Sequence, residues 1–484
     1  MLQPAARRLA FAGMASACLL ASLASTGSAA WPNPLLPPWP PTFNMSLSTI
    51  AQPCNYSGML EPTFASQFGL LDLDWSNAKL IWANSHPMNS EELMVQQAQE
   101  LKKRNPASHQ WVYRNLVKAL PWMKTVRDKL QDPAYAGFFL RFRPDTGAAL
   151  CNGTTPCATT RCDTNYNPPR CSPLYHDQDQ SPQHPAPHDK RMGFCTDACD
   201  CGTGVPCGEY LWDHRNGSML REFLMEEYIG GPTGVDHPAI DGIFFDDGWQ
   251  GPRGPTEIGH GPQGGARALV DMGLSAADAA EITEAWSATM LAAHHRVLKS
   301  HAFDWQLLNC PHYPTKMNSG CGGASTQAPD RDTTNPQPGC TSFMRKYCGP
   351  SGPFQKMALM FGFTRATQYD PLFTTNLSLP FFKQDLATFL AVRGPYAWLG
   401  YGFQGCAGHT QPHDAFPGPT WREAGYVFPP ELSVDYGEPE DGSFCQETAN
   451  GSEIFTREYT KATVTMDCAK FEGTITMKAG RVDE

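Results

Sequence analysis

The sequence predicts an α/β protein built on a (β/α)8 TIM-like barrel, with cysteine-rich loop insertions and a small C-terminal antiparallel β region. Short apolar runs alternate with amphipathic helical segments about seven times, which predicts parallel strands joined by crossover helices. The chain of 484 residues is too long for one small core. Near its end, apolar and polar residues alternate as in antiparallel strands. A doubly wound sheet is the alternative, but no glycine-rich phosphate-binding motif follows the first predicted strand.

The predicted elements follow one another in a regular order. The first helix, with Ser90 as its N-cap, shows helical spacing of its apolar residues. The best strand is the apolar run at residues 239–246, which is bounded by polar and glycine residues. Strands are predicted at residues 68–75, 111–117, 209–214, 239–246, 304–309, 356–363 and 396–401, and helices at 91–103, 125–130, 218–228, 276–300 and 382–393.

The predicted organisation has four parts. Residues 1–30 form a signal peptide and residues 31–66 a proline-rich extended lead-in. Residues 67–430 form the barrel, and residues 431–484 a C-terminal β-segment packed on it. Two cysteine-rich segments without hydrophobic periodicity, residues 148–207 and 310–348, are predicted to be disulfide-rich insertions in barrel loops.

Several features predict a secreted, extracellular glycoprotein. Arg7 and Arg8 precede an apolar run to about Leu23, and the small residues Ser28, Ala29 and Ala30 suit cleavage. Of 17 cysteines one lies in this leader, so 17 − 1 = 16 remain, an even number suited to pairing. Disulfides are favoured over a zinc site at Cys195, Cys199 and Cys201. Acceptor tripeptides for N-glycosylation begin at Asn44, Asn55, Asn152, Asn216, Asn376 and Asn450.

The charge restricts the partners. A formal net charge of −11 and a pI near 5.7 argue against nucleic acid or an anionic membrane as partner. No stretch after the leader has the roughly 18 apolar residues of a membrane span. We therefore expect a neutral or weakly charged substrate, no cofactor and no metal site, and the sequence leaves the oligomeric state open.

Polar residues that end the predicted strands are the candidate site residues, because the active site of such a barrel lies at the carboxyl ends of its strands. Asp246 is the leading catalytic candidate, since three apolar residues precede it and should deliver it to the barrel mouth. Asp247 is expected to face the other way if the strand runs straight through both. Candidates for substrate binding are Asp72, Asp74, Trp75, Arg114, Asn115, His214, Trp249, Asn309 and Tyr401.

The acid partner of Asp246 is left open by the sequence. Asp213, on the neighbouring predicted strand, completes the predicted catalytic set with Asp246 and Asp247, and Asp74 and Asp370 are alternatives. Carboxylates accept hydrogen bonds from sugar hydroxyls, and a pair of them can serve as acid and as nucleophile or base in glycoside hydrolysis. The motif Gly-x-Ser-x-Gly of serine hydrolases is absent from the sequence.

One strand and several short pieces of a late region carry a resemblance to a known family. Asp-Gly-Ile-Phe-Phe-Asp at residues 241–246, Asp-Tyr-Gly-Glu-Pro at 435–439 and Phe-Thr-Arg-Glu-Tyr at 455–459, followed by Ala-Thr-Val-Thr-Met, resemble the hypothetical glycosyl hydrolase families of TIM-barrel type. The fourth-strand aspartate also looks like the nucleophile of the α-galactosidase-like barrels, which implies that role for Asp246. The chain departs from the pattern at Lys461-Ala462 and Met466-Asp467, and in its two cysteine-rich insertions.

The leading hypothesis is a secreted glycoside hydrolase that cleaves O-glycosidic bonds of a poly- or oligosaccharide by a two-carboxylate mechanism. The alternative is a catalytically inactive barrel that binds glycans as a lectin-like or extracellular matrix protein. A third possibility is a metal-dependent hydrolase that uses Asp246, Asp247 and His214. The first hypothesis requires a second carboxylate within about 5–10 Å of Asp246.

Overall fold

The structure is a computed structural model, which describes most of the predicted barrel and the C-terminal region. The predicted signal peptide and most of the first cysteine-rich insertion lie outside the described residues. The described residues are 36–52, 55, 58–141, 161–163, 170–172, 174, 209–249, 254–255, 273–306, 323–326, 337–363, 379, 381–401, 427–440 and 442–479.

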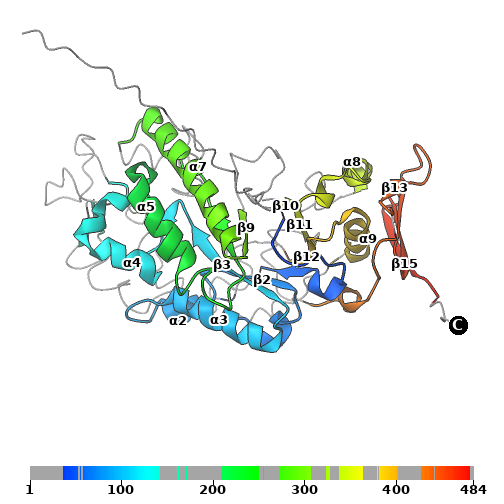
Figure 1. Cartoon of the computed structure of the whole chain (residues 1–484), viewed down its shortest axis with the longest axis horizontal. Helices are drawn as coiled ribbons and strands as arrows, with labels where there is room; N and C mark the ends of the chain where they lie inside the picture. The colour runs from blue at the N-terminus through cyan, green and yellow to red at the C-terminus, as the bar shows by residue number, and fades with distance from the viewer. Residues whose placement is uncertain are drawn as a thin grey trace, which may run out of the picture. The chain divides into compact units, whose positions relative to one another are not determined.

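Eight parallel strands form the central sheet (Figure 1). Their order in space is β10-β11-β12-β1-β2-β3-β8-β9. The last strand of this sheet along the chain, β12, therefore pairs with the first, β1. Apolar side chains dominate these short strands, as expected where both faces of a parallel sheet are covered. The strands are β1 (Thr49–Ala51), β2 (Leu70–Leu73), β3 (His109–Asn115), β8 (Gly242–Asp246), β9 (Phe303–Gln306), β10 (Gly323–Thr326), β11 (Ala358–Gly362) and β12 (Ala397–Tyr401).

This strand order distinguishes the two architectures that the sequence allows. A doubly wound sheet reverses its strand order at a switch point, whereas here each strand lies beside its neighbours in the chain and β12 returns to β1. The α/β class and a curled parallel sheet are therefore confirmed. A pairing of β9 with β10, which would close a (β/α)8 barrel, is not among the pairings of the described residues, so closure stays a prediction.

Helices lie along the outside of the sheet, as Figure 1 shows for α3 and α7. In α7, Ser275 and Asp278 form a capping box, and residues such as Ile282, Trp286 and Met290 are buried at helical spacing. The helices are α1 (Pro62–Ala65), α2 (Lys79–Trp82), α3 (Ser90–Arg104), α4 (Lys124–Gln131), α5 (Ser218–Phe223), α7 (Ala276–Lys299), α8 (Gln337–Tyr347) and α9 (Phe382–Val392). None of the helices in the described part of the chain has the length and apolarity needed to cross a membrane.

The structure corrects four local predictions. The predicted strand at 209–214 is only β7 (Tyr210–Leu211), which pairs antiparallel with β4 (Lys118–Ala119) outside the parallel sheet. β1 lies inside the predicted proline-rich lead-in, while β10 and α8 lie inside the predicted second insertion. The N-cap of α3 is Asn89 rather than Ser90, because Ser90 is already helical and its hydroxyl donates to the carbonyl of Trp122.

The segment before β1 covers the amino end of the sheet. The ring of Trp39 stacks on His109, with centroids 3.6 Å apart, and meets Phe303 and Trp398 edge-on. The Trp39 indole N–H donates to the carbonyl of His301 at 3.2 Å. These contacts explain why a proline-rich, extended segment is ordered without forming a helix or strand of its own.

A second, antiparallel sheet follows the parallel one, as the period of the tail predicts. α9 packs against three of its strands and is buried from Asp385 to Val392, so it has no polar face. Its strands, in the order of the chain, are β13 (Gln446–Glu447), β14 (Ile454–Glu458), β15 (Ala462–Asp467) and β16 (Glu472–Met477).

Two disulfides join α8 and the residue that follows it to this second sheet. Cys340 pairs with Cys468 and Cys348 with Cys445, across 128 and 97 residues of sequence. Both bonds close long loops, which restricts the unfolded chain most strongly. They are compatible with an oxidising, extracellular environment.

Removing the first of these bonds should destabilise the fold. We expect the double variant Cys340→Ser/Cys468→Ser to lose roughly 2–5 kcal/mol of unfolding free energy, because the open chain regains loop entropy. Urea unfolding of the oxidised proteins measures the difference. A reductant should lower the Tm of the parent protein more than that of the variant, and equal losses would contradict the assignment.

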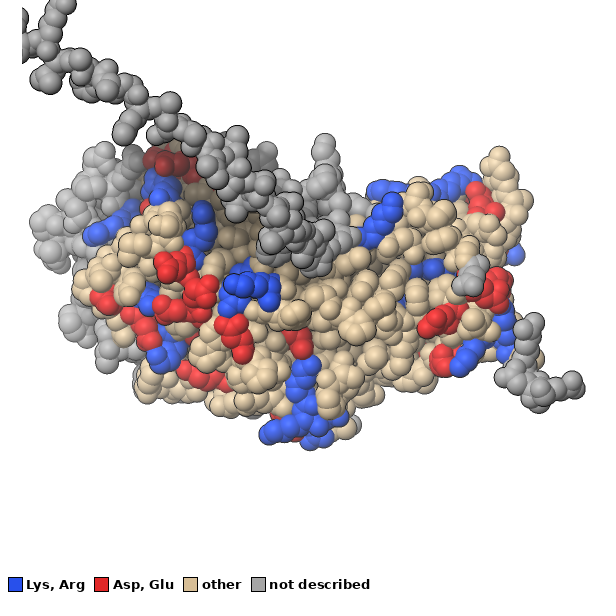
Figure 2. Space-filling model, viewed as in Figure 1, with Lys and Arg blue, Asp and Glu red and all other residues tan. Residues whose placement is uncertain are grey.

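Charged side chains of both signs are interspersed on the face that Figure 2 shows. The basic last turn of α3, formed by Lys102, Lys103 and Arg104, lies near acidic residues, and Lys102 is ion-paired with Asp241 at 2.8 Å. On this face the described residues form no continuous basic stripe of the kind that tracks a nucleic-acid backbone.

Candidate functional site

The candidate site lies at the carboxyl ends of β2, β3 and β8. The strand register pairs Tyr113 with Phe244 and Asn115 with Asp246, so these side chains share the inner face of the curled sheet. Asp72 pairs with Trp111 and belongs to the same face. β2 and β8 both flank β3, which places their backbones about 10 Å apart. Inward-pointing carboxylates from the two strands therefore converge.

Each carboxylate oxygen of Asp246 accepts a hydrogen bond. The Tyr113 hydroxyl donates to Oδ2 at 3.0 Å, and the backbone N–H of Asp247 donates to Oδ1 at 2.8 Å. The side chain is half-buried, whereas Asp72, Asp74 and Asp247 are buried. Asp246 therefore combines a fixed orientation with contact to solvent.

Asp247 does not simply point away from Asp246. Its φ of 59° is left-handed, which is unfavourable for a non-glycine residue, so the strand stops running straight at this position. Its carboxylate accepts a hydrogen bond from Asn115 at 2.6 Å and lies 3.3 Å from the ammonium of Lys118. Lys118 also pairs with Glu209 at 3.1 Å. Burial raises the pKa of Asp247, and Lys118 and Asn115 oppose that shift.

The side chain of Asn115 links Tyr113, which binds Asp246, and Asp247 to the turn after β3 through hydrogen bonds. Its amide nitrogen donates to the Tyr113 hydroxyl at 2.9 Å and to Asp247. Its carbonyl oxygen accepts from the backbone N–H groups of Val117 and Lys118, at 2.8 and 2.7 Å. With its hydrogen-bonding capacity engaged in this way, the side chain fixes both its neighbours and the turn that presents Lys118.

The two carboxylates of β2 carry raised pKa values. Burial, together with the charges of Asp74 and Asp246, raises the pKa of Asp72 well above its ordinary value. Burial also raises the pKa of Asp74, against the hydrogen bonds from Ser76 and the charge of Lys79. Oδ1 of Asp72 has no hydrogen-bond partner among the described residues, while Oδ2 accepts from Gln52 at 3.4 Å. Both acids are therefore disposed to hold a proton.

Trp75 and Lys79 border the carboxylates. Lys79 is buried, and that burial lowers its pKa to about 7, against the charges of Glu209 and Asp74. Its ammonium lies 4.6 Å from the centre of the Trp75 ring, and Trp122 packs against the same ring at 4.7 Å. Trp75 is half-buried, so its indole ring is held by these contacts and presents an edge to solvent rather than an open face.

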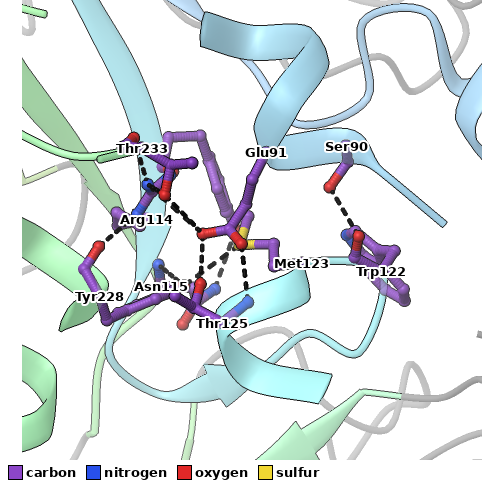
Figure 3. A network of polar contacts seen from close by, with 10 residues as sticks. Ser90, Glu91, Arg114, Asn115, Trp122, Met123, Thr125, Tyr228 and Thr233 are labelled. Atoms are coloured by element: carbon purple, nitrogen blue, oxygen red, sulfur yellow. Dashed lines mark hydrogen bonds and ion pairs between the residues drawn. The ribbon is translucent and has the colours of Figure 1, made fainter. Parts of the chain in front are cut away.

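Arg114 lies on the opposite, outer face of β3 (Figure 3). Its guanidinium is fully buried and donates to the carbonyls of Tyr228, Tyr113 and Thr233 at 2.8, 2.8 and 2.6 Å. It also lies 3.5 Å from the carboxylate of Glu91, which accepts a hydrogen bond from the backbone N–H of Thr125 at 2.8 Å. This network fastens β3 to the helical layer, and it places Arg114 away from the acids.

His214, Tyr401 and Asp213 make their contacts away from this cluster. His214 is buried between the Leu116 carbonyl and Thr289, and burial lowers its pKa to about 4. The Tyr401 hydroxyl bonds the backbone of Val427, and its position in β12 is in register with Ala51, on the outer face. Asp213 caps the turn after β7 and is bonded to Arg215. Trp249 is buried, and Asn309 lies outside the described residues.

Sequence reasoning did not identify five residues of the cluster. Tyr113 could have been found, because it precedes Asn115 by two residues and so shares its face of the strand. Gln52 follows the unpredicted strand β1. Lys79 begins the short helix α2, Lys118 begins the two-residue strand β4, and Glu209 precedes β7, so none of them ends a predicted strand. Within the described residues no group of three or more His, Cys, Asp and Glu is arranged to hold a metal ion.

Removing the charge of Asp72 should stabilise the protein. Because its pKa is raised in the folded state, ionised Asp72 costs stability near neutral pH, and the cost vanishes as pH falls through that raised value toward 3.8, the ordinary one. We expect Asp72→Asn to gain roughly 1–3 kcal/mol at about pH 7. Thermal unfolding at several pH values measures the gain, which should shrink on acidification. If Asp72→Asn were less stable than the parent at every pH, the carboxylate of Asp72 would stabilise the fold, which contradicts the prediction.

Comparison with known proteins gives no close relative. No family model matches the chain, and no curated protein matches it. Among solved structures, trehalose-6-phosphate hydrolase from Bacillus licheniformis is similar at 7% identity and a TM-score of 0.37, over 74% of this chain and 64% of that chain. Sucrose 6F-phosphate phosphorylase from Thermoanaerobacter thermosaccharolyticum is similar at 9% identity and a TM-score of 0.41, over 90% and 98%. A trehalulose synthase variant reaches 10% identity and a TM-score of 0.42, over 88% and 90%.

At these TM-scores the similarities carry no argument about fold or activity. The assignment of the fold rests on the strand order, and that of the site on the contacts around Asp246.

Proposed function

We propose that this protein is an extracellular glycoside hydrolase that cleaves O-glycosidic bonds of an oligo- or polysaccharide. The observation that carries the proposal is the convergence of carboxylates at the ends of β2 and β8, with Asp246 oriented by Tyr113 and by the N–H of Asp247. Asp246 and Asp72 lie close enough for the charge of one to raise the pKa of the other. A pair of carboxyl groups in different protonation states is the requirement of this reaction.

Asp246 is the nucleophile or base in this proposal. Its two donors stabilise the ionised form, and its partial exposure leaves it accessible to a sugar or a water molecule. Burial raises the pKa of Tyr113 well above its ordinary value, so its hydroxyl stays protonated and remains a donor to Asp246. In the reaction Asp246 either attacks the anomeric carbon or takes a proton from the attacking water.

Asp74 is the acid that best fits the second role. Its raised pKa favours the protonated form, which can give its proton to the leaving glycosidic oxygen. Lys79, next to it, can return a proton at neutral pH because its own pKa is about 7. Asp213 is less suited to this role, because Arg215 pairs with its carboxylate at 2.9 Å. Asp247 is a positioning residue, held by Asn115 and Lys118.

The substrate in this proposal is an uncharged glycan. The five acids Asp72, Asp74, Glu209, Asp246 and Asp247 outnumber the two ammonium groups Lys79 and Lys118 within the described cluster, which disfavours sulfated or carboxylated sugars. Trp75 is half-buried beside Tyr113, so a sugar would meet the exposed edge of its ring.

The test is a screen of the purified, secreted protein against neutral and acidic plant and algal polysaccharides, read by the release of reducing ends. We expect turnover of a neutral glycan, and NMR of the first product then gives the anomeric outcome. Binding to a glycan in a pull-down assay, without release of reducing ends from any substrate, would favour the catalytically inactive, lectin-like alternative.

Loss of the Tyr113 hydroxyl should weaken the reaction without weakening binding. We expect Tyr113→Phe to lower kcat by about 10- to 100-fold with little change in KM, because Asp246 loses one of its two orienting donors. The acidic limb of the pH profile should move to higher pH, since the ionised carboxylate is less stabilised. Tyr228→Phe, on the outer face of the sheet, is the matched control and should leave the acidic limb in place.

A further inference from the structure

Four of the six N-glycosylation acceptor tripeptides have their asparagine within the described residues. These asparagines are Asn44, Asn55, Asn216 and Asn450, and each is followed at the second position by serine. The sequence therefore gives no ground to separate them. Their surroundings in the folded chain differ sharply.

Asn55 is only 3% exposed and is part of the structure around the candidate site. Its side-chain nitrogen Nδ2 donates to the carbonyl of Met59 at 3.0 Å. Its backbone N–H donates to the side chain of Asn77 at 2.7 Å, and its carbonyl accepts from the N–H of Ala78 at 2.8 Å. These bonds hold the chain after β1 against the turn between Asp74 and Lys79. A glycan on Nδ2 would replace one of its two hydrogens and would need space that a buried side chain lacks.

The other three asparagines are exposed. Asn44 precedes a short 3-10 helix and accepts hydrogen bonds from Ser46, from its N–H at 3.0 Å and its hydroxyl at 2.9 Å, through its side-chain oxygen. Asn216 and Asn450 each precede a glycine with positive φ, Gly217 at 69° and Gly451 at 80°. Such turns carry the preceding side chain at the surface.

We infer that Asn44, Asn216 and Asn450 carry N-linked glycans in the folded, secreted protein, whereas Asn55 does not. In the transfer, Nδ2 of asparagine forms a bond to the anomeric carbon of a lipid-pyrophosphate-linked oligosaccharide. The bond between that carbon and the pyrophosphate oxygen breaks, the lipid pyrophosphate leaves, and Nδ2 gives up one proton. The acceptor keeps a single N–H, and a modified Asn55 would have to give up its buried position to make room for the saccharide.

Transfer takes place on the extended chain, so burial does not by itself block modification of Asn55. Burial acts after the transfer, because a chain modified at Asn55 has to break the hydrogen bonds that join the segment after β1 to the turn that follows Asp74. Leaving a buried polar group without its partner destabilises the folded chain, and the space needed by the saccharide adds to that cost. Chains modified at Asn55 should therefore be removed before secretion, which leaves the secreted population unmodified at this position.

Two of the inferred glycan positions lie on parts of the fold other than the strand ends that carry the acids. Asn44 lies before β1, at the amino end of a parallel strand, whereas the acids lie at the carboxyl ends. Asn450 lies in the hairpin between β13 and β14 of the second sheet. The inference rests on the proposed extracellular location and on exposure and hydrogen bonding, and it does not depend on the proposed hydrolase activity.

The test uses the full chain secreted from a eukaryotic host. Glycans are removed with a peptide N-glycosidase in heavy-oxygen water, which converts each modified asparagine into a labelled aspartate, and peptide mass spectrometry then gives the occupancy of each site. We expect label at Asn44, Asn216 and Asn450 and none at Asn55. Substantial label at Asn55, or none at any one of the other three, overturns the inference.

Two matched variants separate glycan loss from misfolding. Ser57→Ala removes the acceptor tripeptide of Asn55 but keeps Asn55 itself, so the mass of the secreted protein should not fall beyond the substitution. Ser218→Ala removes that of Asn216 and should lower the mass by one glycan. A glycan-sized loss in Ser57→Ala, or no such loss in Ser218→Ala, contradicts the inference, and equal thermal unfolding of the variants and the parent shows that the fold is intact.

Discussion

Asp246→Asn is expected to lower kcat/KM on the glycan substrate by at least about 10³-fold, with substrate binding nearly unchanged. The amide keeps the size of the carboxylate, and its single oxygen can still accept from the N–H of Asp247, while its NH2 group can donate to the Tyr113 hydroxyl oxygen. What it lacks is the charge that attacks the anomeric carbon or activates water. Steady-state kinetics of release of reducing ends, together with calorimetric binding of the same glycan, measure the two effects separately.

The matched control is Asp236→Asn, which removes an acid that is ion-paired with Arg296 at the surface, at 2.7 Å. It should retain full activity. Asp74→Asn should slow substrates with poor leaving groups far more than aryl glycosides, because only the former need a proton donor. Full turnover by Asp246→Asn would exclude Asp246 from the reaction, and an equal loss on all substrates in Asp74→Asn would exclude Asp74 as the acid.

The regular spacing of apolar residues along the chain predicts most of the helices and strands. The run at 239–246 and the helical patterns at 276–300 and 382–393 correspond to β8, α7 and α9 within a few residues. β1 and β10 were not predictable in the same way, because the first has three residues among prolines and the second is Gly-Ala-Ser-Thr. Their membership of the sheet is decided by pairing with neighbours far away in the sequence.

The rule that strand ends carry function identified only part of the site. It selected Asp72, Asp246 and Asn115, which share the inner face, but also Arg114 and Tyr401, which are in register with outward-facing residues. Because side chains alternate between the two faces of β3, Asn115 and Arg114 face opposite sides of the sheet. The sequence does not say which of the two faces inward. The left-handed backbone of Asp247 also has no sequence signal, since it depends on bonds to Asn115 and Lys118.

Replacement of Arg114, whose side chain faces outward from β3 behind the site, should have the largest effect on the free energy of unfolding. We expect Arg114→Met to lower the unfolding free energy by about 3–5 kcal/mol, because it leaves the buried carboxylate of Glu91 without its cation and three backbone carbonyls without their donor (Figure 3). Urea denaturation followed by tryptophan fluorescence measures the change. Since Tyr113 and Asn115 flank Arg114 in β3, activity at low temperature should fall as well.

Arg104→Met is the matched control, because Arg104 and Glu100 form the same kind of ion pair at 3.0 Å on an exposed turn of α3, with both side chains 43% exposed. That pair should contribute only about 0.3–0.5 kcal/mol, since water screens it. The double variant Glu91→Gln/Arg114→Met should recover part of the loss, because it removes the unpaired buried charge and its amide oxygen keeps an acceptor for the N–H of Thr125. If Arg114→Met were no more costly than Arg104→Met, the network behind β3 would not be what holds Tyr113 and Asn115 toward the acids, and their orientation would have to come from the inner face alone.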